Sequence, residues 1–141
     1  MNIRELQTPA VLIRSAALQN NLKKYQSACD EHGKQLWPMV KTHKSTVMAQ
    51  MQRELGAAGF LCGTLDECEA LCDAGMTRLM YAYPVAGAVS CKRAVQLAQR
   101  CEFYVRIDTV EAAAQLDEAA AQAGVTVMYT VILDCGLHRF G

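Results

Sequence analysis

The strongest constraint on this chain is a regular alternation of short apolar runs with amphipathic helical patterns, at a spacing of roughly 20–25 residues. A strand followed by a helix, repeated in this way, is typical of parallel α/β structure. The apolar runs lack strict polar–apolar alternation, which favours strands buried on both faces. Extended segments are predicted at residues 9–13, 35–41, 59–63, 78–83, 103–107 and 125–133.

Capping residues and glycines mark where the intervening helices begin and end. Ser15 is the predicted cap of the first helix, while Thr64 and Asp108 each precede a glutamate by three residues, as in a capping box. Helices are predicted over residues 15–33, 45–55, 64–75, 90–100 and 108–124. Two architectures remain open: a doubly wound sheet, and part of a (β/α)₈ barrel.

Composition excludes several classes of function. Hydrophobic residues make up 52% of the 141 residues, so the chain can build a core and is not disordered. Its net charge is zero, which provides no basic field for nucleic acid or for a membrane surface. No apolar run approaches the roughly 20 residues of a membrane span, and the first residues do not resemble a secretory signal. We therefore expect a cytoplasmic protein.

The seven cysteines favour reduced thiols over a disulfide framework, because their number is odd and no C-x-x-C pair occurs. Cys68 and Cys72 are four residues apart on a predicted helix and could share a metal ion. No further ligands follow at a suitable spacing, so the pattern favours two buried apolar side chains. Both phosphate-cradling fingerprints, G-x-G-x-x-G and G-x-x-x-x-G-K-[ST], are missing.

The densest polar cluster is Lys41-Thr42-His43-Lys44, at the carboxyl end of the second extended segment. Active sites of parallel α/β folds lie at such strand ends. Apolar surroundings would favour the neutral amine that imine formation requires at Lys41. The residues alone favour a solvated turn with two surface lysines, and leave the reactive lysine as the alternative.

Four other polar or ionisable residues are weaker candidates for a functional site. Arg139 follows the last predicted strand and could hold an anionic oxygen, although a frayed tail explains it equally. His43 and His138 could act as acids or bases, but a polar loop residue is the simpler interpretation. Cys135 could be a nucleophile, although a packed thiol is favoured.

Three segments occur in the order and at the spacing of a known family: Gln7 to Ile13, Pro38 with the Lys41 to Lys44 tetrapeptide, and Gly136 to Gly141. With them, the chain resembles the N-terminal part of the D-threonine aldolase and D-serine dehydratase group. These are fold type III pyridoxal-phosphate enzymes related to the alanine racemase N-terminal domain. The resemblance spans almost the whole chain and implies an α/β fold, namely a partial (β/α)₈ barrel of about five parallel strands.

The resemblance also implies roles for two residues. Lys41 matches the lysine that forms the imine with pyridoxal phosphate, and Arg139 matches the arginine beside the phenolic oxygen of the pyridine ring. The implied substrates are D-3-hydroxy amino acids, and a homodimer or other self-association is expected. The family usually has Arg-Pro-His before the lysine, whereas this chain has Trp37-Pro38-Met39, so we expect the polar groups that line this stretch of the pocket to be lost.

Length is the larger departure, because a complete barrel needs about 250 residues. Residues 1–141 therefore match the N-terminal part of the cofactor-binding barrel, without the C-terminal β domain or the family's divalent metal ligands. We expect a truncated form with little activity. A D-threonine aldolase type of lyase is the first hypothesis, and a D-serine dehydratase type is the second. A non-catalytic remnant or interaction module, and an unrelated doubly wound binding protein, are the others.

Overall fold

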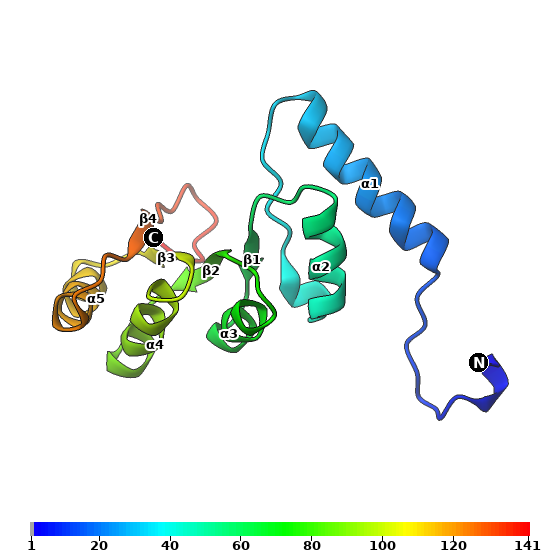
Figure 1. Ribbon diagram of the computed structural model, residues 1–141. Coiled ribbons are helices and arrows are strands. Elements are labelled where there is room, and N and C mark those ends of the chain that lie inside the picture. Colours follow the sequence, from blue (N-terminus) through cyan, green and yellow to red (C-terminus); the bar gives the residue numbers. More distant parts are fainter. Residues whose placement is uncertain (1) are drawn as a thin grey trace.

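The computed structural model describes residues 2–141 and contains one sheet of four parallel strands. The strands are β1 (Phe60–Cys62), β2 (Arg78–Pro84), β3 (Glu102–Ile107) and β4 (Met128–Val131), and they lie in chain order. Helices α3 (Leu65–Asp73), α4 (Ala88–Ala98) and α5 (Val110–Ala123) connect them and lie side by side on one face of the sheet (Figure 1). A doubly wound sheet would carry helices on both faces, so this arrangement is a segment of barrel wall.

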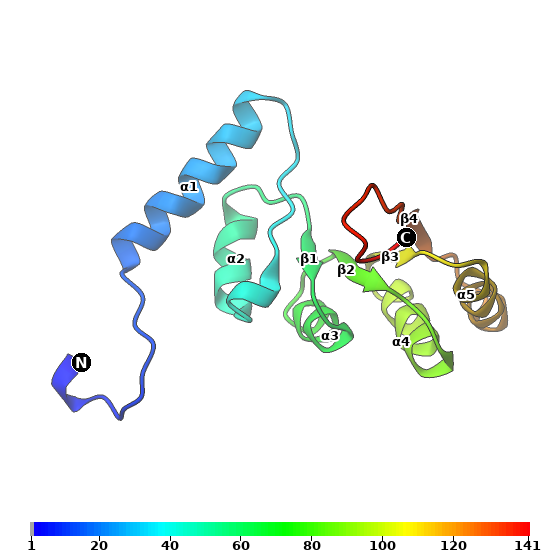
Figure 2. The same cartoon turned by 180° about the vertical axis from the view of Figure 1, so that it is seen from behind.

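Two further helices precede the sheet. Helix α2 (Thr46–Glu54) lies beside β1, and helix α1 (Ser15–Glu31) extends away from the body of the molecule, as both views show (Figures 1 and 2). The structure also contains the short 3₁₀ helices η1 (Ile3–Glu5) and η2 (Val40–Thr42). No helix in residues 2–141 combines the length and the apolar character needed to cross a membrane.

The core lies between the sheet and helices α3 to α5. Strand pairing aligns Phe60 with Leu79 and Leu79 with Phe103, and all three side chains are buried. Leu71 and Leu97 pack against this layer from α3 and α4. Apolar side chains of neighbouring strands therefore form continuous rows under the helices, and this burial is the main stabilisation of the fold.

The predicted helix starts are partly confirmed. Thr64 accepts a hydrogen bond from the Glu67 backbone N–H, as the capping box predicts. The predicted Ser15 cap is wrong, because Arg14 occupies the cap position and makes no side-chain bond. Thr109 rather than Asp108 caps α5, through a bond from the Ala112 N–H. The fourth predicted helix begins at Ala88, two residues before residue 90.

Three predicted strand boundaries also differ from the structure. Residues 9–13 form no strand, and Val11 is 94% exposed, because no neighbouring strand lies alongside to complete their hydrogen bonds. Residues 35–41 lie beside β1 as predicted, but Met39 makes only a single bridge to Leu61 before the chain turns into η2. Of residues 125–133, only Met128–Val131 pair with β3.

Candidate functional site

Three side chains from distant parts of the sequence meet at the carboxyl end of the sheet. Lys41 comes from η2, Tyr83 from the end of β2, and Arg139 from the loop after β4, which returns over the sheet (Figure 2). The Tyr83 hydroxyl oxygen accepts a hydrogen bond from Lys41 Nζ at 3.3 Å and another from Arg139 Nη2 at 3.1 Å. The two predicted site residues therefore lie close together, joined by a residue that the sequence did not indicate.

Aromatic rings surround this meeting point. The ring of Tyr83 packs edge-on against Phe140, with centroids 5.4 Å apart, and against Tyr81 at 6.2 Å. Lys41 Nζ and Arg139 Cζ lie 5.8 and 5.5 Å from the Tyr83 ring centroid, so both cations lie close to this residue. The hydrogen bond from Lys41 is the main cause that lowers the pKa of Tyr83, and the Arg139 charge contributes in the same direction. The site is thus electropositive around one phenolic oxygen.

The Glu67 side chain stabilises the loop that carries Lys41. Its carboxylate accepts a hydrogen bond from the Gly63 backbone N–H at 2.7 Å and pairs with Lys44, whose backbone adopts φ +50°. Burial alone would raise the pKa of Glu67, but the Lys44 and backbone hydrogen bonds outweigh it and lower that pKa. Lys44 therefore donates to Glu67, while Lys41 donates to the Tyr83 hydroxyl oxygen.

Gly63 allows the Lys41 side chain to lie against the end of β1. A Cβ atom at this position would stand 3.0 Å from Lys41 Cβ and 3.3 Å from Lys41 Cδ, both tighter than ordinary contact. The close approach of the loop to the strand end therefore depends on the missing side chain.

The structure places His43 in a capping contact at the start of helix α2. Its Nδ1 accepts a hydrogen bond from the Ser45 backbone N–H at 3.1 Å, just before helix α2. Burial lowers the pKa of His43, while nearby Gln52 and Glu67 oppose this change. A neutral imidazole that orients the start of α2 fits this environment.

The other residues of the C-terminal loop interact mainly with each other. His138 is exposed and pairs with Asp134 at 2.9 Å, while Asp134 also accepts backbone bonds from Gly136 and His138. The backbone bond from His138 is the main cause that lowers the pKa of Asp134. Cys135 is exposed, and its Sγ contacts the Leu133 carbonyl. Asp134 thus shapes the turn that leads to Arg139.

The two cysteines of α3 face different neighbours. Cys68 is buried next to Cys62, and their hydrogen bond together with burial raises the pKa of Cys68. Burial and the neighbouring Cys72 raise the pKa of Cys101 to about 12. Within residues 2–141, no three side chains of the metal-ligating types gather at one point, so we assign no metal ligand.

Trp37 lies at the opposite end of the sheet from Lys41. Its ring contacts the Arg78 guanidinium at 5.3 Å and meets Tyr104 edge-on at 5.8 Å, near the first residues of β2 and β3. Gly59 makes room for it, since a Cβ there would collide with the indole. Trp37 therefore contributes to packing at the amino end of the strands, away from Lys41.

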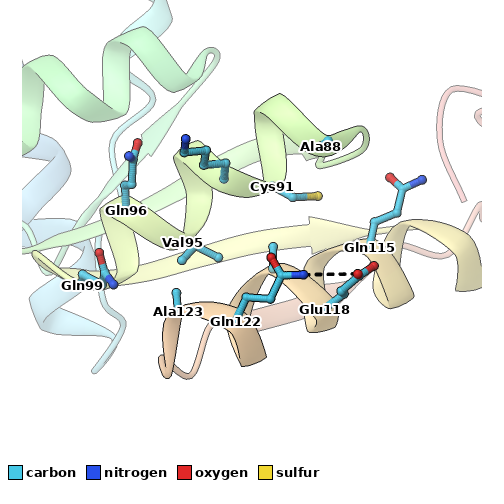
Figure 3. Close-up of a pocket in the computed structure, with 11 residues that line it drawn as sticks. Ala88, Cys91, Val95, Gln96, Gln99, Gln115, Glu118, Gln122 and Ala123 are labelled. Carbon is cyan, nitrogen blue, oxygen red and sulfur yellow. Dashed lines mark hydrogen bonds between the residues drawn. The ribbon is translucent and has the colours of Figure 1, made fainter.

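Two grooves lie on the helix side of the molecule, and neither includes a candidate site residue. One, of about 700 Å³, runs between α4 and α5 and is lined by glutamines and alanines, with a hydrogen bond between Gln122 and Glu118 (Figure 3). The other, of about 850 Å³, lies between α5 and β4 and is mostly apolar. The convergence at Tyr83 is therefore the strongest candidate site.

Comparison with known proteins places the chain in a family and agrees with its fold. Residues 13–141 match the family model described as "Alanine racemase, N-terminal domain". The chain is 34% identical over 137 residues to D-threo-3-hydroxyaspartate dehydratase of Delftia sp. (strain HT23), and 29% identical over 139 residues to D-threonine aldolase of Arthrobacter sp.. These alignments cover 96% and 99% of this chain, but 36% and 37% of the relatives. The chain thus spans little more than a third of their length.

A solved structure of a D-threonine aldolase has the same fold over its matched part. The D-threonine aldolase of Filomicrobium marinum superposes with a TM-score of 0.95 at 30% identity, covering 99% of this chain and 38% of that one. The chain belongs to the family of the alanine racemase N-terminal domain. Its fold is the first part of that family's barrel, as the sequence predicts.

Sequence reasoning missed two residues of the site. Tyr83 is the last residue before Pro84 at the carboxyl end of a predicted strand, and strand-end position alone could have indicated it. Glu67 was predicted as a helix-cap residue, but its contact with Lys44 links segments distant in the sequence. The contact between Glu67 and Lys44 therefore produces no local pattern in the sequence.

Proposed function

We propose that this chain forms the first part of the cofactor-binding barrel of a pyridoxal-phosphate-dependent lyase that acts on D-3-hydroxy amino acids, of the D-threonine aldolase type. The observation that carries the proposal is the convergence of Lys41 and Arg139 on a single oxygen. The family supports it, as do relatives named D-threonine aldolase and D-threo-3-hydroxyaspartate dehydratase.

The residues present fit this cofactor. Pyridoxal phosphate carries an aldehyde next to a phenolic oxygen, so it needs an amine and an anion-stabilising donor close together. Lys41 supplies the amine, and Arg139 supplies a permanent cation that donates to the same Tyr83 oxygen. The Tyr83 hydroxyl shows that an aromatic oxygen can accept from both donors at once.

When bound, the cofactor supplies an electron sink for charge that develops at the substrate Cα. Lys41 would hold the cofactor through Nζ, which must be a neutral amine to do so. Arg139 would hold the phenolic oxygen through a charge-assisted hydrogen bond. Glu67 and Lys44 keep the loop of Lys41 in place, and the ring of Phe140 packs edge-on against Tyr83.

A dehydratase reaction on the same substrates is the second candidate, because the relative at 34% identity is named a dehydratase. The products distinguish the two, since an aldolase yields glycine and an aldehyde, whereas a dehydratase yields ammonia and a keto acid. Residues 2–141 provide no feature that separates these outcomes. Both candidates share the same role for Lys41.

Absorbance titration with pyridoxal phosphate tests the proposal. We expect a visible band of lysine-bound cofactor with the natural sequence, and its loss in Lys41→Ala. Lys92→Ala is the matched control, because Lys92 lies on the helix side in the α4–α5 groove, and it should keep the band. No band with the natural sequence, or an unchanged band in Lys41→Ala, would contradict the proposal and favour a non-catalytic remnant or an unrelated binding protein.

A further inference from the structure

Lys41 and Arg139 form an unusual pair, since both are cations and both point at one neutral side chain. No carboxylate among residues 2–141 forms an ion pair with either of them, whereas Lys44, Arg78, Arg93 and Arg100 all have acidic partners. Two converging cations without a carboxylate define a position that favours an anionic oxygen. In this structure the Tyr83 hydroxyl oxygen occupies that position.

The Tyr83 oxygen has the same chemistry as the oxygen that the cofactor would bring. Each is a hydroxyl on an aromatic ring, and each becomes a stronger acceptor when it loses its proton. Lys41 and Arg139 lower the pKa of Tyr83, which favours the phenolate form. The same two donors would act in the same way on the phenolic oxygen of pyridoxal phosphate.

The surroundings of Tyr83 allow it to leave this position. Its side chain is only half-buried, and its ring is held by edge contacts with Tyr81 and Phe140 rather than enclosed by the core. Phe140 directly follows Arg139, whose guanidinium lies 5.0 Å from the Phe140 ring. A shift of the C-terminal loop would therefore release Tyr83 and open its side of the site.

We propose that Tyr83 is a placeholder for the cofactor: its hydroxyl holds Lys41 and Arg139 together before binding, and the phenolic oxygen of pyridoxal phosphate displaces it. This inference rests on the proposed function. It assigns Tyr83 a positioning role in the cofactor-free protein and a competing role during binding. Two oxygens cannot occupy one acceptor position, so removing the Tyr83 hydroxyl favours the bound state.

The first test needs no cofactor. With ¹³C-labelled tyrosine, the titration of Tyr83 can be followed by NMR, using Tyr83→Phe to assign its signal. We expect a midpoint below the ordinary tyrosine value of about 10, and an upward shift in both Arg139→Gln and Lys41→Ala. A midpoint that responds to neither substitution would show that the cations do not converge on Tyr83, and would overturn the inference.

The second test measures affinity for pyridoxal phosphate by absorbance. We expect Tyr83→Phe to bind about tenfold more tightly than the natural sequence, because the competing hydrogen bonds are lost. Tyr81→Phe, on the same strand but without a hydrogen bond to either cation, should bind as the natural sequence does. With the 3-deoxy analogue, which keeps the aldehyde but lacks the phenolic oxygen, Tyr83→Phe should show no gain. Equal or weaker binding of pyridoxal phosphate by Tyr83→Phe would overturn the placeholder role.

The two proposals fail in different ways. If Lys41 binds the cofactor but Tyr83→Phe gives no tighter binding, the placeholder role is wrong and the proposed function stands. If the natural sequence binds no cofactor at Lys41 although Tyr83 titrates as expected, the function is wrong and the placeholder role falls with it, leaving Tyr83 as a structural link between two cations.

Discussion

Lys44 pairs with the buried carboxylate of Glu67, and this contact joins the loop after Met39 to the first turn of helix α3. Glu67 also accepts the Gly63 N–H at the end of β1. One carboxylate thus connects the loop, the strand end and the helix that surround Lys41. The position of Lys41 therefore depends on these contacts of Glu67 as well as on the residues that would contact the cofactor.

We expect Glu67→Gln to lower the free energy of unfolding by about 1–2 kcal/mol at pH 7, because the buried group loses a charge-assisted partner that is itself two-thirds exposed. The folded-state pKa of Glu67 is lowered. The stabilisation is therefore present above the ordinary glutamate pKa of about 4.3 and is lost as the pH falls through the folded-state value.

Urea unfolding at several pH values measures this effect. The difference between Glu67→Gln and the natural sequence should narrow as the pH falls below about 4. Asp66→Asn is the control, because its carboxylate is 81% exposed where it pairs with Arg93, and it should cost less than about 1 kcal/mol. A difference that stays constant with pH would show that the Glu67 charge does not stabilise the fold.

Gly63→Ala should slow the reaction of Lys41 with pyridoxal phosphate by about tenfold, because a displacement of less than 1 Å spoils reacting geometry. The added methyl group would press on the Cβ and Cδ atoms of Lys41. Stopped-flow absorbance gives the rate, and circular dichroism shows whether the fold is retained. A folded variant that reacts at the natural rate would mean that Lys41 does not depend on this contact.

Strand β4 is an unpaired edge, and we expect it to drive self-association. Residues 125–133 contain neither charge nor proline, and the adjoining groove between α5 and β4 is mostly apolar. Size-exclusion chromatography with light scattering should show a dimer or larger species. Val131→Lys should shift the association equilibrium towards monomer. Val47→Lys on α2, at a similarly exposed position, should leave that equilibrium unchanged. A monomeric natural sequence with strong hydrogen-exchange protection throughout residues 125–133 would contradict this.

Purified polypeptide 1–141 should cleave little or no D-threonine. It matches little more than a third of its aldolase relatives, and the positioning of reacting groups alone is worth about 7–11 kcal/mol of a reaction barrier. Coupled detection of acetaldehyde, with and without divalent metal ions, measures the activity. Robust cleavage stimulated by metal would show that residues 1–141 contain all the parts needed.

The sequence predicts structural features that depend on residues close together in the chain, such as helix ends. The Thr64 cap and the glycine after α5 follow from local hydrogen bonding and backbone preference, and both are confirmed. The chain order of β1 to β4 with one-sided helices follows from the strand–helix repeat and the family resemblance. Local capping chemistry failed at Ser15 and Asp108, where the adjacent Arg14 and Thr109 take the cap positions.

What escapes prediction depends on distant contacts. Residues 9–13 have the composition of a strand, but a strand forms only beside a partner, and the structure places none there. Tyr83 is an ordinary strand residue until the C-terminal loop brings Arg139 to it. The resemblance predicted a site that contains Lys41 and Arg139, and the roles of both residues remain predictions.

Chemical trapping tests whether Lys41 is the residue that binds the cofactor. Incubation with pyridoxal phosphate, reduction with borohydride and peptide mass analysis would locate the modified lysine among all those in the chain. The account predicts a phosphopyridoxyl mass on Lys41, with Lys44 held by Glu67 and unmodified. Modification mainly on Lys44, or equally on exposed lysines such as Lys92, would contradict it.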